Sequence, residues 1–324
     1  MSRTFLKPVV VISKCLEFEA CRYNGAKISF GLLGRMQPYI DFLPVCPEVE
    51  IGLGTPRDPI RLVADGEGHQ LLVQPSTGKN LTAKMQGFAR GYLNSVKSID
   101  GFILKAKSPS CGIRDAKVFK TADESYSLGK GPGIFTSEVL ERFGGQAVED
   151  EGRLNNFTLR EHFLTKLFSL AVFRKLKNSL SMQALIRYQS ENKLLLMAYN
   201  QAALRDMGRI IANHANKTLE KVASTYEEQL HRALARPAKR LSNINVLMHA
   251  MGYFSKQLKI SEKSFFLDAL ERYRARKIPL SVPLQVLRAW IVRFESEYLK
   301  NQTYFEPYPE DLMEISDSGK GRDL

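Results

Sequence analysis

The sequence predicts an α/β N-terminal domain with a parallel, Rossmann-like sheet, followed by an all-α C-terminal domain. The chain has 324 residues, and a single hydrophobic core rarely serves more than about 250–300 residues. Short apolar runs alternate with turn-rich segments in the first half, whereas the second half has helical periodicity throughout. We therefore expect a first domain over residues 1–150, a polar linker at 151–156, a helical domain over 157–315 and a disordered tail at 316–324.

Three apolar runs in the first half predict the strands of the sheet. Residues 8–13 form a β-branched run typical of a central strand, and residues 41–46 and 99–105 are two further short runs. A helix is expected over 81–95, between the second and third runs. Alternation of strand and helix favours a parallel sheet with crossover helices. Three of the four cysteines then lie at or just past strand ends, where ligands bind in open α/β sheets.

Capping signals and apolar stripes predict the helices of the second half. Thr158 and Glu161 form a capping-box pattern before an apolar stripe that runs from Phe163 to Ala171. Pro283 fits the first turn of another helix, with Trp290 on its apolar face. Five more helices are expected near residues 181–196, 200–214, 218–235, 239–256 and 262–276.

Composition points to a globular cytoplasmic protein that keeps its thiols reduced. Hydrophobic residues make up 44% of the chain, and no stretch approaches the roughly 20 apolar residues of a membrane helix. The apolar run near the N-terminus is short and lacks a cleavage site, so we interpret it as a buried strand and not as a signal peptide. All four cysteines lie within the first 111 residues. In the cytosol a disulfide framework is not expected, which leaves metal binding, catalysis or simple burial.

Positive charge is concentrated in the second half of the chain. The formal net charge is +13, and residues 151–300 alone carry +14. Such a basic region indicates a polyanionic partner, with nucleic acid as the leading candidate. A solvated basic surface without a partner is the alternative.

The spacing of the cysteines leaves more than one kind of site open. Structural zinc sites usually show cysteine pairs two to four residues apart, whereas here the gaps are 5, 24 and 64 residues. A nucleophilic cysteine needs a nearby base, and His69 is the only histidine of this half. Iron–sulfur clusters are held by thiolates, usually four of them. Spacing by itself does not decide between these possibilities.

Three separated motifs resemble the thiouracil desulfidase family. They are Cys15-Leu16 followed by Arg22-Tyr23-Asn24-Gly25, then Val45-Cys46-Pro47-Glu48 leading into Gly52 to Arg57, and finally Lys107 to Gly112. The resemblance covers roughly residues 7–150, and the three motifs occur in the family's order. The helical remainder resembles the YbgA-type domain that is found fused to this desulfidase domain, so the whole chain is similar to tRNA 4-thiouridine desulfidases.

The resemblance implies a [4Fe–4S] cluster held by Cys15, Cys46 and Cys111, with one iron left open. Cys21 would be the spare cysteine. The chain departs from the family at Glu17 and Phe18 and at Ala26, which leaves the loop shape open and allows Cys21 to lie near the cluster. A soft substrate sulfur suits an open iron. The iron would polarise the carbon–sulfur bond so that water replaces sulfur by a hydrolytic route without electron transfer.

Six residues near the cysteines are candidates for catalysis or substrate binding. Glu48, two residues from Cys46, is expected to activate water or to shuttle protons; the alternatives are a helix cap and a salt bridge to Arg57. Ser108 and Ser110 flank Cys111, and either hydroxyl could bond the substrate or an oxyanion, or serve only the turn around Pro109. Substrate-binding candidates are Arg57, Arg61 and Lys107. The glycine-rich residues 129–133 lack the ending of a phosphate-binding P-loop, and we interpret them as a surface turn.

The basic second half favours a thiolated tRNA, because phosphate contacts dominate nucleic-acid affinity. Tyr273 lies within one basic cluster and could stack on a base or belong to a helix core. We therefore expect removal of sulfur from 4-thiouridine, flipped out of its stack. Two alternatives stay open: desulfuration of free 2- or 4-thiouracil, and a non-catalytic iron–sulfur sensor that binds nucleic acid. The tRNA-binding candidates are Arg174, Lys175, Lys177, Arg232, Arg236, Lys239, Arg240, Arg272, Arg274, Arg276 and Lys277.

Overall fold

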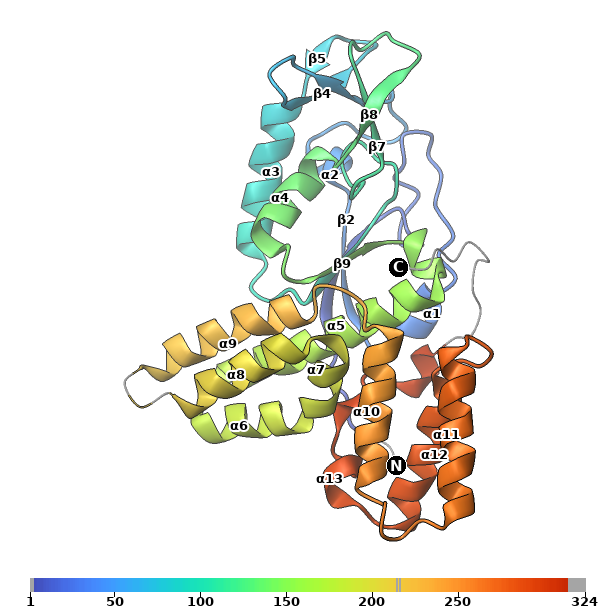
Figure 1. The fold of residues 1–324 in the computed structure, drawn as a ribbon. Coiled ribbons are helices and arrows are strands. Elements are labelled where there is room, and N and C mark those ends of the chain that lie inside the picture. The colour runs from blue at the N-terminus through green and yellow to red at the C-terminus, as the bar shows by residue number, and fades with distance from the viewer. Residues whose placement is uncertain (1–2, 214, 216, 314–324) are drawn as a thin grey trace. The chain divides into compact units, whose positions relative to one another are not determined.

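The computed structural model describes residues 3–213, 215 and 217–313 and divides into two compact units (Figure 1). The sheet unit comprises Thr4–Ala171 and a short segment that begins at Asp311, and the helical unit is built on Val172–Glu310. The boundary between the units lies inside helix α5 (Phe157–Asn178). The predicted tail at 316–324 lies outside the described residues.

A four-stranded parallel sheet forms the centre of the sheet unit and confirms the predicted α/β class. Its strands are β1 (Val9–Ser13), β2 (Asp41–Val45), β6 (Gly101–Leu104) and β9 (Ala147–Asp150), in the order β2-β1-β6-β9. All three pairings are parallel. The chain leaves β1 toward β2 on one side and reaches β6 on the other, so the order of strands reverses between β1 and β6. Ligands bind at such switch points.

Burial on both faces explains why the sequence identified the central strands. Val10, Val11 and Ile12 of β1 are fully buried, as are Phe102 and Ile103 of β6. Parallel strands covered on both sides are continuous apolar runs, not alternating ones. The sequence-based expectation for residues 8–13, 41–46 and 99–105 is therefore confirmed, while β9 was not predicted.

A second, mostly antiparallel sheet was not predicted. It contains β3 (Arg61–Ala64), β4 (Gln70–Gln74), β5 (Lys79–Asn80), β7 (Ala116–Phe119) and β8 (Ser127–Gly131), in the order β5-β4-β3-β7-β8. Only the β3–β7 pairing is parallel. Strands β5 and β8 are short, exposed and rich in lysine or glycine, so they lack the apolar pattern that marks a strand.

Helices α3 (Thr82–Ser95) and α4 (Ile134–Phe143) lie side by side against the sheet unit's core (Figure 1). Two single-turn helices, α1 (Leu33–Met36) and α2 (Pro47–Glu50), and a 3₁₀ turn at Arg153–Asn155 complete the unit. The expected helix at 81–95 is confirmed by α3.

The first half of α5 covers strand β6. A Cβ atom added to Gly101 of β6 would lie 2.8 Å from Cδ1 of Leu167, so the glycine permits this close packing. The helix begins two residues earlier than its capping-box pattern suggested. Asn156 Oδ1 accepts a hydrogen bond from the Leu159 backbone N–H at 3.0 Å, which makes Asn156 the cap and places Thr158 inside the helix.

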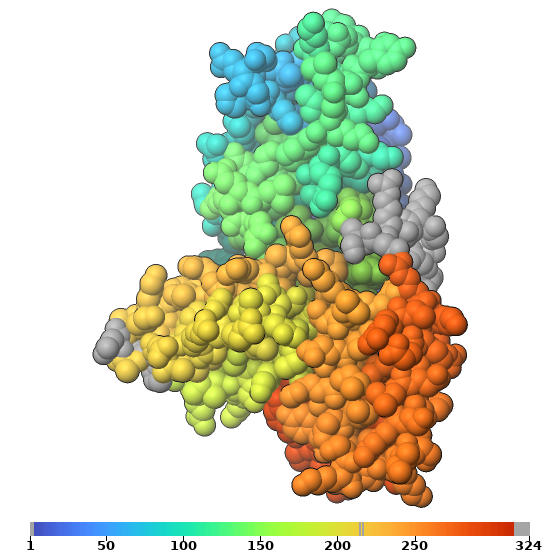
Figure 2. All heavy atoms as spheres, viewed as in Figure 1, coloured from blue at the N-terminus to red at the C-terminus, as the bar shows by residue number. Residues whose placement is uncertain are grey.

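The helical unit confirms the predicted all-α second half (Figure 1). Figure 2 shows the atoms of the same chain as spheres in the same view and colours. The expected helix at 181–196 is two helices, because Asn192 ends one and begins the next. Trp290 is buried in the core as predicted, and Leu287 of the same helix is buried with it. The helices are α6 (Met182–Glu191), α7 (Lys193–Tyr199), α8 (Gln201–Ala212), α9 (Leu219–Ala233), α10 (Arg240–Gly252), α11 (Ile260–Arg274), α12 (Ser281–Arg293) and α13 (Glu297–Lys300), with 3₁₀ turns at Thr303–Phe305 and Glu310–Leu312. None of the helices within the described residues is both long and apolar enough to cross a membrane.

Candidate metal centre and active site

A cavity of about 400 Å³ opens at the carboxyl ends of the parallel strands. Cys15 follows the end of β1 by two residues, Cys46 follows β2 directly, and Cys111 lies in the loop after β6. Cys15, Cys21 and Cys111 line the cavity. Because this is the β1–β6 switch point of the sheet, the fold brings cysteines from three separate segments to the place where ligands bind.

All four cysteines are buried and none forms a disulfide. Their exposed fractions are 8% or less. The Cys46 Sγ lies 3.8 Å from the backbone oxygen of Cys21, and the thiols of Cys21 and Cys46 are hydrogen-bonded to each other. Ser13, at the end of β1, hydrogen-bonds the Cys111 thiol and accepts a hydrogen bond from the Lys105 backbone N–H at 2.9 Å.

Burial raises the pKa of the thiols of Cys15, Cys21 and Cys111. The pKa of Cys15 rises to about 12, chiefly through burial and secondarily through the neighbouring Cys46 thiolate. The pKa of Cys21 rises to about 12 for the same two reasons, and burial raises the pKa of Cys111 well above its usual value. Several buried thiols in one place favour a bound cation, because a metal displaces the protons and compensates the thiolate charge.

The separation of the sulfur atoms fits a cluster better than a single zinc ion. Tetrahedral zinc with bonds of about 2.3 Å holds its sulfurs about 3.8 Å apart. Within the described residues, the only three potential ligands whose atoms all lie within 4.8 Å of one another are Asp65, Glu67 and His69. No three of the cysteine sulfurs therefore lie that close to one another, which fits a group whose thiolates each bind a different iron.

The loop that carries Cys111 is braced from two sides. Inside the loop, the Ser108 hydroxyl accepts hydrogen bonds from the backbone N–H groups of Ser110 and Cys111 at 3.2 and 3.1 Å. From outside, the first turn of α4 donates to the loop: Gly133 N–H to the oxygen of Gly112 at 2.8 Å, and Thr136 N–H to the oxygen of Ser110 at 3.2 Å. The position of Cys111 therefore depends on α4.

Gly133 allows that close approach of α4. A Cβ atom there would lie 2.4 Å from the carbonyl carbon and oxygen of Ser110. The interpretation of residues 129–133 as a surface turn is thus wrong. The segment forms the end of β8 and the N-cap of α4, and both Gly131 and Gly133 are buried. Glycine serves close backbone approach here rather than phosphate binding.

Glu48 joins the cysteine loops to the serines. Its Oε1 accepts hydrogen bonds from the Ser110 hydroxyl at 2.5 Å and the Ser108 hydroxyl at 3.4 Å. Its Oε2 accepts from the Arg57 Nε at 2.9 Å and also pairs with Nη2. Glu48 and Ser108 line the cavity, whereas Ser110 is fully buried behind it. Glu48 therefore forms the salt bridge to Arg57 that is the alternative to a catalytic role, and it also lines the cavity.

The three substrate-binding candidates lie in different surroundings. Arg57 lines the cavity, but its side chain is only 4% exposed and its Nη1 donates to the backbone oxygens of Cys21 and Gly54. Lys107 is exposed at the cavity, with a left-handed φ of 62°. Arg61 is not among the cavity residues. It donates to the oxygens of Ala122 and Glu124 and lies over the Phe119 ring, so the structure gives it a role in the second sheet.

Lys105 and Glu151 are cavity-side residues that the sequence analysis missed. Lys105 lines the cavity, and its Nζ pairs with Glu151 Oε1. Glu151 Oε2 accepts the Ala106 backbone N–H at 2.8 Å. The pair ties the end of β6 to the residue after β9. Glu151 had been assigned to the polar linker, and no local signal distinguishes it from a surface acid.

Arg22 and Tyr23 form the outer rim of the cavity. Both line it, Tyr23 is 42% exposed, and the Arg22 guanidinium lies 5.4 Å from the Tyr23 ring centre. An exposed aromatic ring beside a cation can stack on a planar base. Both residues belong to the Arg-Tyr-Asn-Gly motif, for which the sequence indicates only a family resemblance and no role.

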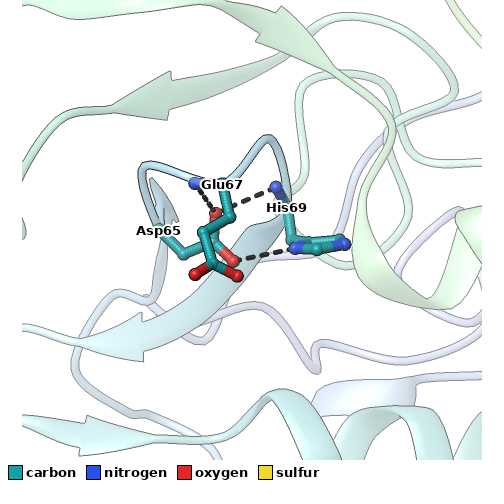
Figure 3. Close-up of side chains that lie close together, drawn as sticks. All are labelled: Asp65, Glu67 and His69. Atoms are coloured by element: carbon teal, nitrogen blue, oxygen red, sulfur yellow. Dashed lines mark hydrogen bonds and ion pairs between the residues drawn. The ribbon is translucent and has the colours of Figure 1, made fainter.

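His69 lies outside the cavity, on the turn between β3 and β4 (Figure 3). Asp65 Oδ1 accepts the backbone N–H groups of Glu67 and His69, and Asp65 Oδ2 lies 3.0 Å from His69 Nδ1. All three side chains point into solvent-exposed space. The hydrogen bonds are those of a tight turn, and the histidine is not among the residues that line the cavity.

The basic residues of the helical unit are largely exposed, whereas Tyr273 is not. Arg236, Lys239, Arg272 and Lys277 are exposed, while the Lys177 Nζ pairs with Glu227 Oε2 at 2.7 Å. Tyr273 is 7% exposed and lies beneath Arg240, 5.5 Å from its guanidinium. Of its two interpretations, the core residue is the one that the structure supports. Two aromatic side chains of this unit are exposed: Phe265, at 64%, and Tyr253, which is 47% exposed and stacked on Tyr298. The remaining candidates Arg174, Lys175, Arg232, Arg274 and Arg276 are half-buried or exposed.

Comparison with known proteins divides the chain in the same two parts. Residues 10–151 match the model of the 2-thiouracil desulfurase family, and residues 193–309 match a family of unknown function, DUF1722. Uncharacterized protein YbgA of Escherichia coli (strain K12) is 30% identical over 148 residues, 45% of this chain and 88% of that protein. Uncharacterized protein YbbK of Bacillus subtilis (strain 168) is 30% identical over 155 residues, 46% of this chain and 99% of that protein. A solved structure, the [4Fe-4S]-dependent thiouracil desulfidase TudS, is 30% identical and covers 46% of this chain and 93% of its own, with a TM-score of 0.36.

Proposed function

The chain belongs to the 2-thiouracil desulfurase family over residues 10–151 and to the DUF1722 family over residues 193–309, and from this premise we propose that it is an iron–sulfur-dependent desulfidase of thiolated uracil in tRNA. One observation carries the proposal. Cysteines from separate segments meet at one cavity whose wall also holds a carboxylate, Glu48. The cysteines supply thiolates that can hold a cluster. The carboxylate beside them can act as the general base that takes a proton from water.

We propose Cys15, Cys46 and Cys111 as the ligands of a [4Fe–4S] cluster. Each follows the end of a strand or lies in a braced loop, and their burial excludes solvent from the thiolates. When bound, the cluster would act as a Lewis acid toward the sulfur of the base. Lys105, paired with Glu151 at the cavity wall, adds a positive charge close to the thiolates.

Glu48 is proposed to accept a proton from the attacking water. Arg57 holds Oε2, and Ser110 holds Oε1, so the carboxylate is fixed in one orientation toward the cavity. Ser108 lines the cavity, and its hydroxyl can donate a hydrogen bond to the thiolated uracil. Ser110, buried and bonded to Glu48, is a positioning residue in this scheme.

Two features support tRNA as the source of the thiolated base. The helical unit, residues 172–310, has a formal net charge of +11, and exposed Arg and Lys side chains can bind phosphates without regard to sequence. Tyr253 is an exposed ring that can stack on a base. The proposed product is uridine, with sulfide released and no electron transferred.

The size of the cavity also favours a second substrate, free thiouracil. A volume of about 400 Å³ lies within the range of small-molecule sites, about 300–1,000 Å³. In that case the basic helical unit has another role.

The test uses the full chain, reconstituted anaerobically with iron and sulfide. It is incubated with tRNA that contains 4-thiouridine, or with free 2- or 4-thiouracil. Loss of the near-ultraviolet absorbance of the thiolated base and release of sulfide are measured, beside a Cys111→Ala control. Turnover of tRNA by the wild type alone supports the proposal. Turnover of the free base alone selects the second substrate, and an intact cluster with neither reaction contradicts a catalytic role and favours a sensor.

A further inference from the structure

The cavity holds a fourth thiol that the proposed cluster does not use. Cys21 lines the cavity together with Cys15 and Cys111, and it is only 1% exposed. Its thiol is hydrogen-bonded to that of Cys46. All four cysteines of the chain are therefore gathered at one site.

Cys21 differs from the other three in the backbone that carries it. Cys15 lies two residues after β1 and Cys46 follows β2 directly, and the Cys111 loop is fixed by Ser108 and the start of α4. Cys21 lies in the turn-rich segment between the Leu16 and Ile28 bridge partners, and the exposed residues 23–25 follow it. The Cys21 carbonyl is held mainly by one side chain, Arg57, whose Nη1 donates to it at 2.9 Å.

We propose that Cys21 is a releasable fourth thiolate of the cluster site. Clusters of this kind are usually held by four thiolates, and Cys21 is the thiol within reach that lies on the least constrained segment. In the absence of substrate, Cys21 binds the iron that the other three cysteines leave free. The thiol gives its proton to solvent on binding and recovers one on release, and no electron is transferred. When substrate binds, its sulfur would take the place of the Cys21 thiolate on that iron, so that one sulfur ligand is exchanged for another. This inference rests on the proposed function.

The first test measures protection of thiols from alkylation. The full-length protein, loaded anaerobically, is treated with iodoacetamide without substrate, and each cysteine is assigned by peptide mass spectrometry. We expect all four cysteines of the loaded protein to be protected. The same treatment of the native cluster-free protein gives the baseline for protection by burial. Labelling of Cys21 in the loaded protein, with Cys15, Cys46 and Cys111 protected, would overturn the inference.

The second test does not depend on accessibility. Mild oxidation removes an iron that lacks a protein ligand, and the resulting three-iron cluster is detected by electron paramagnetic resonance. Cys21→Val and Cys21→Ala are compared with wild type, because valine keeps the packing volume and alanine does not. We expect both variants to form the three-iron cluster several-fold faster than wild type, and to show a several-fold lower KM for thiouracil because no internal thiolate competes. Equal rates of iron loss in wild type and Cys21→Val would contradict the proposal.

Cluster assembly in wild type and in the variants distinguishes failure of the proposed function from failure of the role of Cys21. A wild-type protein that assembles no cluster overturns the proposed function and this inference together. A cluster that assembles in wild type, is lost in Cys111→Ala and behaves identically in Cys21→Val leaves the proposed function in place and overturns the role of Cys21 alone.

Discussion

At the scale of single residues, Glu48 is the carboxylate on which the proposed chemistry depends. Both of its oxygens have partners from other segments, Arg57 on one side and Ser110 on the other. Such fixed orientation is what a general base requires, because the proton must be reached at hydrogen-bond distance.

Replacing Glu48 by Gln should remove the base and keep the shape. General acid–base catalysis contributes about 10²–10⁴-fold, so we expect kcat to fall by about that factor while the visible absorbance of the cluster is unchanged. The control is Glu50→Gln, an exposed acid on the same short helix, which should retain full activity. Sulfide release under anaerobic conditions gives the rate. Wild-type turnover in Glu48→Gln would exclude Glu48 as the base.

Removing the side chain of Arg57 should lower the free energy of unfolding. Its side chain is 4% exposed and bonds both the Glu48 carboxylate and the Cys21 carbonyl. Breaking a buried pair by removing one partner costs about 3–5 kcal/mol, because the other charge stays buried. We expect Arg57→Ala to lower Tm by roughly 6–20 °C, at about 2–4 °C per kcal/mol for a chain of this class.

The control for Arg57 is Arg114→Ala, which removes an exposed arginine of the same unit. Surface substitutions of this kind usually change stability by less than about 0.5 kcal/mol. Thermal unfolding of the cluster-free proteins measures both. Equal Tm values for the two variants would show that the Glu48–Arg57 pair does not stabilise the fold.

The residues that the sequence identified are those that carry rare chemistry. Cysteines next to strand ends indicated the site because the chain has only four of them and reduced cysteine has few roles other than burial, catalysis and metal binding. Lys105 and Glu151 could not be found in this way, since a lysine and a glutamate 46 residues apart in the chain carry no local mark of their pairing. Tertiary contact alone gives them their place at the cavity.

At the scale of elements, α4 acts on the metal site without supplying a ligand. Its first turn donates hydrogen bonds to the loop that holds Cys111, and Gly133 makes the approach possible. A Gly133→Ala substitution forces backbone against backbone, and such overpacking typically costs about 1–3 kcal/mol.

We therefore expect Gly133→Ala to lower Tm and to reduce the iron content of the reconstituted protein. Gly129→Ala is the matched control, because a Cβ atom at that exposed position meets nothing within 4 Å. Iron and sulfide analysis measures loading, and circular dichroism measures Tm. Unchanged loading in Gly133→Ala would show that the α4 contact does not position Cys111.

Helix α5 carries a half-buried histidine, His162, that we expect to make the sheet unit sensitive to acid. Burial, with a further contribution from Lys166, lowers the pKa of His162 to about 4 from an ordinary value near 6.5. Between pH 6.5 and 4 the unfolded chain binds the proton and the folded chain does not, so stability falls as the pH is lowered through this range.

Replacing His162 by Gln should flatten the acid side of the stability profile. The free energy of unfolding of the cluster-free protein, measured by urea titration at several pH values, is expected to decline less steeply between pH 6.5 and 4 in the variant. His249→Gln, on α10 of the helical unit, serves as control and should keep the wild-type slope. Identical slopes for wild type and His162→Gln would contradict the assignment.

The two sheets show which elements can be predicted from sequence. Strand β1 is apolar at every position from Val9 to Ile12, because both faces of the sheet are covered. Strand β8 reads Ser-Leu-Gly-Lys-Gly and is exposed except at its last residue. Its pairing with β7 depends on partner backbone atoms and not on its own side chains, so no periodicity in the sequence reveals it.

At the scale of the whole molecule, the chain joins a site of limited volume to a strongly basic helical unit. The fold classes of both parts followed from periodicity and length. The division between the units did not, because it falls within the continuous helix α5, where no turn residue marks it. The domain boundaries at 151–156 therefore stay a prediction.

The exposed basic residues of the helical unit should make tRNA binding sensitive to salt. If exposed arginines and lysines bind tRNA phosphates, the affinity should fall with salt, with a slope of about 0.7–0.9 in log Kd against log salt for each contact. Neutralising Arg236, Lys239, Arg272 and Lys277 together should weaken tRNA binding and reduce this slope. Turnover of free thiouracil should not change, because none of the four lines the cavity. The control neutralises four exposed lysines of the sheet unit, Lys79, Lys97, Lys117 and Lys120. Filter binding over a range of salt concentrations separates the outcomes: equal slopes for the two quadruple variants would show that the helical unit is not the specific seat of tRNA binding, whereas a smaller slope only in the first would assign it that role.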